Sequence, residues 1–132
     1  MKTDSNCIFC KIVAKDIPAD LVYEDDLTLA FLDNSPINPG HTLLIPKSHK
    51  DHLWDLEKED YHYIMDTTKK IQSALQKTYS PPKVGLVVEG FGVAHAHLHV
   101  IPIYSSEDLN KPHIPTDTNI LDLEAKKIRA NL

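Results

Sequence analysis

The chain has 132 residues, 42% of them hydrophobic, which is enough for one domain whose core needs no disulfide. Its formal net charge of −5 argues against broad electrostatic attraction to nucleic acid or acidic membranes, so we expect a small ligand. The N-terminus lacks an apolar signal segment, and no apolar run has the length of a membrane span. We therefore expect a cytoplasmic protein without a membrane or nucleic-acid partner.

Hydrophobic periodicity predicts five strands and three helices along the chain. Apolar runs between turn residues indicate strands at 21–24, 27–32, 41–45, 83–88 and 95–103. Apolar residues spaced three and four apart indicate a long amphipathic helix at 56–79, which the Ser-Pro-Pro at 80–82 ends. Shorter helices are expected at 7–14 and along the stripe Leu121, Ala125, Ile128 and Leu132.

The order of these elements predicts the fold class. Asp25 and Asp26 are expected to form a tight hairpin turn between the first two strands. Strands joined mainly by hairpins, with one long helix among them, indicate an α+β fold built on an antiparallel sheet of about five strands. We expect one domain over 1–132, with a core at 7–104 and a C-terminal extension at 105–132 that carries the last short helix.

The segment HAHLHVIP at 95–102 places a histidine at every second position of a predicted strand. His95, His97 and His99 would share one face, because side chains alternate along a strand, and the apolar residues between them would face the core. Neighbouring imidazoles gain little from burial unless each finds a hydrogen bond, a proton or a metal ion. Three interpretations stay open: one shared metal ion, acid-base or nucleophilic chemistry, or hydrogen-bonded structural residues.

Cys7 and Cys10 form a Cys-x-x-Cys pair. In a reducing compartment this spacing suggests metal or redox chemistry before a structural disulfide, although it also arises by coincidence. A thioredoxin-like role is disfavoured, because no strand precedes the pair. A closed zinc site would need two further ligands.

Four separated segments of the chain resemble the histidine triad (HIT) superfamily. They are CIFCKI at 7–12, YEDD at 23–26 with AFLD at 30–33, PGHTLLIPKSH at 39–49, and HAHLHVI at 95–101. The resemblance covers the chain from Cys7 to about Tyr104. It implies a nucleotide-binding α+β fold that hydrolyses or transfers at the α-phosphate of a purine nucleotide conjugate, such as a nucleoside phosphoramidate or a dinucleoside polyphosphate.

The resemblance also implies roles for the histidines. His97 would be the nucleophile, forming a covalent nucleotidyl-histidine that water then resolves. Its other ring nitrogen should donate to a carbonyl so that the attacking nitrogen is free. His99 would donate a hydrogen bond to the phosphate, or else pack at the pocket wall. His41 would lie on a neighbouring strand behind the site, in a supporting or a structural role.

The nucleotide pocket follows from the same resemblance. The residues expected around the base are Ile8, Phe9, Ile12 and Ile17, and those at the strand end beside the ribose are Phe31, Leu32, Asp33 and Asn34. The Asp33 carboxylate would accept hydrogen bonds from both ribose hydroxyls, and the alternative is a cap for the turn before Ser35-Pro36. For the apolar residues the alternative is ordinary core.

The loop before the triad departs from the family's nucleotide-binding branch. VEGFGVA at 88–94 is shorter than the usual Gly-rich loop and contains neither Asn nor Gln. Backbone donors in the stretch from Gly90 through Gly92 to Val93 are still expected to hold a phosphate oxygen. The identity of the leaving group stays open.

Several proteins of this type complete the cysteine pair as a zinc site, and the resemblance implies His49 and His95 as the other two ligands here. Such a Cys₂His₂ site would fasten the first helix to the sheet. It would also divide the triad into one structural histidine, His95, and two chemical ones.

Two other functions remain open. The shortened loop suggests a nucleotide-binding regulatory protein with little catalysis, and a zinc-dependent hydrolase would use all three triad histidines as ligands.

We also expect a homodimer. The helix at 56–79 has apolar residues on more than one face: Tyr61, Tyr63, Ile64 and Met65. A helix with more than one apolar stripe needs more than one partner surface.

Overall fold

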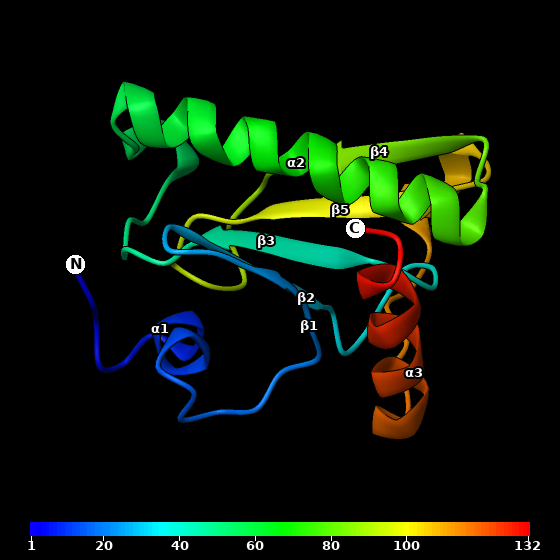
Figure 1. Cartoon of the computed structure of the whole chain (residues 1–132), viewed down its shortest axis with the longest axis horizontal. Helices are drawn as coiled ribbons and strands as arrows, with labels where there is room; N and C mark the ends of the chain where they lie inside the picture. Colours follow the sequence, from blue (N-terminus) through cyan, green and yellow to red (C-terminus); the bar gives the residue numbers. More distant parts are fainter.

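The computed structural model describes residues 1–132 and has a five-stranded antiparallel sheet at its centre, in the order β1-β2-β3-β5-β4 (Figure 1). The strands are β1 (Leu21–Glu24), β2 (Thr28–Leu32), β3 (Thr42–Pro46), β4 (Lys83–Val87) and β5 (Leu98–Ile103). The helices are α1 (Ile8–Val13), α2 (Lys58–Tyr79) and α3 (Thr118–Arg129), with 3₁₀ turns η1 (Leu53–Asp55) and η2 (Ser106–Asn110). The predicted α+β class is confirmed. No helix combines the length and apolarity needed to span a lipid bilayer.

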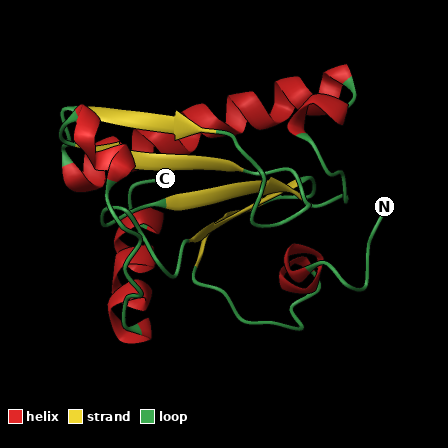
Figure 2. Ribbon diagram, turned by 180° about the vertical axis from the view of Figure 1, so that it is seen from behind, coloured by secondary structure: helices red, strands yellow, loops and turns green.

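The main core lies between one face of the sheet and the two longer helices. Figure 2 shows α2 running along the strands and α3 standing across them at one end. The strands contribute alternate residues such as Ala30, Leu44, Leu98 and Val100, as the two-residue period predicts. The helices contribute Ile64, Ile71 and Leu75 from α2, and Leu121, Ala125 and Ile128 from α3. Burial of a Leu or Ile side chain stabilises a fold by about 1.5–3 kcal/mol. The C-terminal helix is therefore part of this core, although Leu132, predicted in its stripe, is exposed.

The opposite face of the sheet is covered by α1. Phe9 and Ile12 of this helix pack on Phe31 and Leu43, together with Leu29 and Ile45. The rings of Phe9 and Phe31 meet edge to face, with centroids 5.5 Å apart. This smaller cluster holds a helix of six residues, too short to be stable alone, against β2 and β3.

The predicted strand at 95–103 begins only at Leu98, so His95 and His97 precede it. The reason is the neighbouring strand: β3 ends at Pro46, which has no backbone N–H to donate to a longer ladder. The N–H of Ala96 instead donates to the carbonyl oxygen of Lys50, beyond the end of β3. The strand predicted at 21–24 matches β1, while β2, β3, β4 and the first two helices shift by one or two residues, and α3 ends at Arg129, three residues before the end of its predicted stripe.

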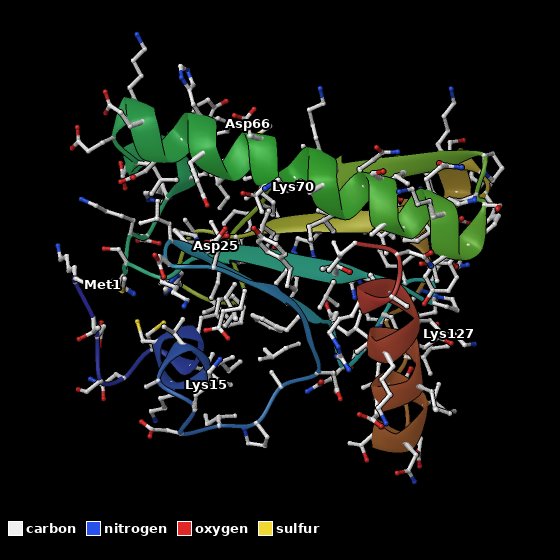
Figure 3. All side chains as sticks on the ribbon, viewed as in Figure 1. Met1, Lys15, Asp25, Asp66, Lys70 and Lys127 are labelled. Atoms are coloured by element: carbon white, nitrogen blue, oxygen red, sulfur yellow. The ribbon has the colours of Figure 1, made fainter.

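The first hairpin turn is organised by Asp25, which is labelled in Figure 3. One carboxylate oxygen accepts from the backbone N–H groups of Leu27 and Thr28, and the other accepts from the hydroxyls of Tyr23 and Tyr63. These hydrogen bonds hold the pKa of Asp25 well below its usual range against the opposing effect of burial. Because Tyr63 belongs to α2, this carboxylate also ties the hairpin to the long helix.

Candidate active site and metal centre

A cleft of about 310 Å³ lies between α1 and the face of the sheet that α1 covers. This volume is at the lower end of the range usual for small-molecule sites. Sixteen residues line it: Ile8, Phe9, Ile12, Ile17, Pro18, Ala19, Phe31, Leu32, Asp33, Asn34, Leu43, Glu89, Gly92, Val93, His97 and His99.

Ten of the eleven residues expected to bind the nucleotide line this cleft, and His97 lines it too. The exception is Gly90, which does not line the cleft. Its φ of 77° is a value that favours glycine, and an added Cβ would meet no atom within 4 Å. Leu32 lines the cleft but also belongs to the main core. The sequence did not point to four lining residues, which are Pro18, Ala19, Leu43 and Glu89, whereas Val93 belongs to the stretch expected to supply backbone donors. The strand register could have identified Leu43 as a cleft residue. It pairs with Phe31 on β2 and with His99 on β5, so its side chain lies on the same face of the sheet as theirs.

His97 is held at the cleft by its own backbone neighbourhood. Its Nδ1 lies 2.6 Å from the backbone carbonyl oxygen of His95. A carbonyl oxygen only accepts, so Nδ1 carries the proton and Nε2 carries the free lone pair. Its ring meets those of Phe9 and His99 edge to face, each at a centroid distance of 5.2 Å. The hydrogen bond expected for a nucleophilic imidazole is therefore present.

A second chain of hydrogen bonds sets the protons of His41 and His99. The N–H of Ile37 donates to Nδ1 of His41 at 3.0 Å, which leaves the proton of this neutral ring on Nε2. That Nε2 lies 2.9 Å from Nδ1 of His99 and donates to it. The remaining proton of His99 is then on Nε2, so this ring offers a donor away from His41.

Burial keeps these rings neutral at neutral pH. It lowers the pKa of His41 to about 4, with smaller effects of the nearby His99 and His113 in the same direction and of Asp33 in the other. The pKa of His99 is also lowered, mainly by burial and then by its neighbour His97. The neutral rings of His41 and His99 keep the alternating donor and acceptor pattern of the hydrogen-bond chain that they share.

The two carboxylate oxygens of Asp33 have different neighbours. Its Oδ1 accepts a hydrogen bond from the N–H of Ser35 at 2.9 Å and so caps the turn. Its Oδ2 lies 3.6 Å from Nε2 of His41, inside the cleft wall. One oxygen is therefore engaged by the turn, and the other faces the histidines.

The four residues expected to hold zinc converge from three distant segments. Cys7 is the N-cap of α1, and Cys10 is its third helical residue. Both Sγ atoms therefore lie on the same side of the first turn. His49 comes from the segment after β3, and His95 from the segment before β5. One ligand atom from each of the four lies within 4.8 Å of all the others.

The spacing of these atoms fits a tetrahedral zinc ion. The distances from Sγ to Nδ1 are 3.3 Å for Cys7 and His95, 3.4 Å for Cys10 and His49, and 3.6 Å for Cys10 and His95. The two Nδ1 atoms lie 3.2 Å apart. Ordinary Zn–S and Zn–N bond lengths at tetrahedral angles require edges of about 3.3 Å between two nitrogens, about 3.6 Å between sulfur and nitrogen, and about 3.8 Å between two sulfurs. Nε2 of His95 donates to the carbonyl oxygen of Pro46 at 2.8 Å, so its Nδ1 presents a lone pair to the centre of the cluster.

Comparison with known proteins supports the resemblance seen in the sequence. The family model for the HIT domain matches residues 14–106, and the chain belongs to this family. A Hit-like protein from Bartonella henselae, described as involved in cell-cycle regulation, superposes with a TM-score of 0.88 at 36% identity over 100% of both chains. A zinc-bound histidine triad family protein from Mycobacterium smegmatis has a TM-score of 0.81 at 30% identity, over 96% of this chain and 92% of that one. An adenosine 5′-monophosphoramidase of Schizosaccharomyces pombe is 40% identical over 99 residues, 74% of each chain.

Proposed function

We propose that this protein is a hydrolase or nucleotidyl transferase that attacks the α-phosphate of a nucleotide conjugate through a covalent nucleotidyl-histidine. The observation that carries the proposal is the 2.6 Å contact between Nδ1 of His97 and the carbonyl oxygen of His95. It leaves the lone pair of Nε2 free on a ring that lines the cleft. The phosphoramidase activity named for the Schizosaccharomyces pombe relative supports the substrate class.

In the proposed reaction, Nε2 of His97 bonds to α-phosphorus while the leaving group departs, and a water molecule later displaces the nucleotide from the ring. Such transition states need hydrogen-bond donors around the phosphate oxygens more than they need further covalent help. The Nε2–H of His99 and the backbone N–H groups of Gly92 and Val93 are the donors that we assign to this task. All three residues line the cleft.

We assign the other end of the cleft to the nucleoside. The apolar walls at Ile8, Phe9, Ile12 and Ile17 offer flat or branched surfaces to a purine base, and Phe31 lies behind them. Asp33 and Asn34 would meet the ribose hydroxyls at the end of β2. Asp33 has the acceptor capacity for this role, because the turn engages only one of its two oxygens.

We further propose that Cys7, Cys10, His49 and His95 hold a structural zinc ion. The support is the tetrahedral spacing of their donor atoms, together with the zinc-bound relative from Mycobacterium smegmatis. Zinc would tie α1, which carries Phe9, to the segment before β5, which carries His97. Its contribution is to folding and to the position of these residues, and the reaction itself uses no metal.

Two copies of this chain are proposed to pair through α2 and the edge strand β4. The terminal strands of the sheet are β1 and β4, and β4 leaves Leu86 46% exposed. Trp54, just before α2, is 71% exposed, and unpaired edges and apolar patches favour association. Sedimentation at micromolar concentration should show a dimer, and a monomer alone would remove this part of the proposal.

The central experiment is turnover of adenosine 5′-phosphoramidate and of a dinucleoside polyphosphate by the purified protein. We expect release of AMP and, in rapidly quenched samples, a covalent nucleotide adduct on His97 detected by mass spectrometry of the intact chain and its peptides. Tight nucleotide binding without turnover would instead favour a regulatory protein, the alternative that the short loop at 88–94 suggests. Turnover that requires added metal in a folded, zinc-loaded protein would favour a metal-dependent hydrolase.

A further inference from the structure

We propose that Glu89 is a catalytic acid and base of this site and selects conjugates in which nitrogen is bonded to the α-phosphorus. The inference rests on the function proposed above and adds to it the class of leaving group. It concerns a residue on the rim of the cleft that the histidine pattern does not include.

The strand register brings Glu89 to the histidines. Val87 is the last residue of β4 and pairs with His99 of β5. A residue two positions further along an extended chain points to the same face, which is the face of His99. The side chain of Glu89 accordingly lines the cleft, and one of its carboxylate oxygens lies within 4.8 Å of a ring nitrogen of both His97 and His99. Its charge acts on His99, where it raises the pKa against the larger lowering caused by burial.

A carboxylate at this place is unfavourable for a phosphate alone. Ionised carboxylate and phosphate oxygens both only accept hydrogen bonds, and their like charges repel. None of the sixteen residues lining the cleft is a lysine or an arginine, so no basic side chain in its wall offsets this repulsion. A Glu89 carboxyl group beside a phosphate therefore requires a proton between the two, held either by the carboxyl group itself or by a group bonded to phosphorus. An amine nitrogen in a P–N bond offers one, and so does an attacking water molecule, whereas a polyphosphate leaving group offers only more acceptors and more negative charge.

The proposed steps use the two protonation states of Glu89 in turn. The conjugate binds with the shared proton on the Glu89 carboxyl group. In the first half-reaction Nε2 of His97 bonds to phosphorus, the P–N bond to the amine breaks, and the amine keeps the electron pair and takes this proton. In the second, the Glu89 carboxylate takes a proton from water as the water oxygen bonds to phosphorus. The bond to His97 then breaks, and its electron pair returns to Nε2. The products are a free amine and a nucleoside monophosphate, and Glu89 is protonated again.

The test separates the two half-reactions by the choice of leaving group. An N-alkyl phosphoramidate of AMP needs a proton to release its amine, whereas the p-nitrophenyl ester of AMP releases a stable anion without one. Rapid-mixing kinetics would compare the wild-type protein, Glu89→Gln, His97→Ala and the control Glu59→Gln. Glu59 is a suitable control because it is an exposed glutamate in the first turn of α2, outside the cleft.

We expect Glu89→Gln to release p-nitrophenolate in a rapid burst of one equivalent per chain, at the wild-type rate, and then to turn over at least a hundredfold more slowly. The covalent adduct on His97 should accumulate during the slow phase. With the alkyl phosphoramidate the same variant should show no burst and a loss of at least a hundredfold. Formate should partly rescue Glu89→Ala, which a merely structural role would not explain. Glu59→Gln should match the wild-type protein with both substrates.

Three results would overturn the role of Glu89 while leaving the proposed function intact. They are wild-type turnover of the alkyl phosphoramidate by Glu89→Gln, an equal loss in the bursts of both substrates, and a wild-type activity that depends on a divalent metal bound by Glu89, His97 and His99. If neither substrate leaves an adduct on His97 in the wild-type protein, the proposed function itself fails, and the role of Glu89 fails with it.

Discussion

Nδ1 of His97 donates to the backbone carbonyl oxygen of His95 at 2.6 Å, while Nδ1 in the ring of His95 lies 3.3 Å from Sγ of Cys7. The main chain of His95 therefore orients the proposed nucleophile, and its side chain belongs to the proposed metal centre. His95 therefore contacts both the N-terminal helix, through Cys7, and the ring of His97 in the cleft. Four predictions follow from this arrangement and from the neighbouring contacts.

Replacement of the proposed nucleophile should separate binding from chemistry. His97→Ala is expected to lower turnover by about a thousandfold or more, because no other group at the cleft is placed to form the covalent intermediate. Nucleotide affinity, measured by calorimetry with AMP, should change little, since fifteen other residues line the cleft. A variant that keeps more than about a tenth of the wild-type rate would contradict covalent catalysis by His97.

Asp33→Asn should weaken the binding of AMP more than that of its 2′,3′-dideoxy analogue. The asparagine side chain keeps one oxygen for the N–H of Ser35, so the turn cap survives, but it loses the charged acceptor proposed for the ribose. Loss of a charged acceptor costs about 1.5 to 3 kcal/mol of binding free energy. Titration of both ligands against both proteins gives the comparison. Equal weakening of the two would assign Asp33 to the turn alone.

The zinc proposal predicts about one zinc ion per chain in protein purified without chelator. Cys10→Ser and His49→Ala should lower both the zinc content and the melting temperature, because a metal bound only by the folded chain contributes to its stability. His97→Ala is the matched control and should change neither quantity. Zinc that is lost with His97→Ala or His99→Ala, but kept in Cys7→Ser, would place the ion in the cleft and refute this ligand set.

The buried imidazole of His41 should make the fold less stable in acid. Its pKa is lowered from 6.5 to about 4 in the folded chain, chiefly by burial, so between these values the unfolded chain binds more protons. The stability attributable to neutral His41 is thus fully present above pH 6.5 and is lost as the pH falls toward 4. The full shift corresponds to ~3 kcal/mol.

Chemical denaturation across this pH range measures the effect. His41→Asn keeps an acceptor for the N–H of Ile37 and has no titrating ring, so its free energy of unfolding should fall less steeply with acid than that of the wild-type protein. Asp33, His99 and His113 are the other groups whose charges act on the pKa of His41, and both proteins contain them, so the difference between the two curves reports His41 together with its coupling to these neighbours. Parallel curves would show that His41 does not carry this dependence.

The spacing of apolar residues along the chain was sufficient to predict most of the secondary structure. The spacing of Ile64, Thr68, Ile71 and Leu75 reflects the turn of an α-helix, and all four are buried in α2. The alternation of Leu98 and Val100 likewise predicted their place in the core. The Cys-x-x-Cys pair at a helix start also needs no distant partner to present both sulfurs on one side. Such patterns are visible in the sequence because they depend on neighbours within one or two turns or pleats.

Tertiary structure decided where these elements end and what they bring together. Pro46 closes β3 and so leaves His95 and His97 outside the regular strand, although each was predicted to belong to it. The sulfur of Cys7 meets the ring of His95 across 88 positions of the chain, and Glu89 reaches the histidines through the pairing of β4 with β5. Contacts of this kind depend on strand order, register and helix packing, which are set by the whole core. The residue types of the site could therefore be read from the sequence, but the direction of each ring, the free oxygen of Asp33 and the approach of Glu89 were decided only by the folded chain.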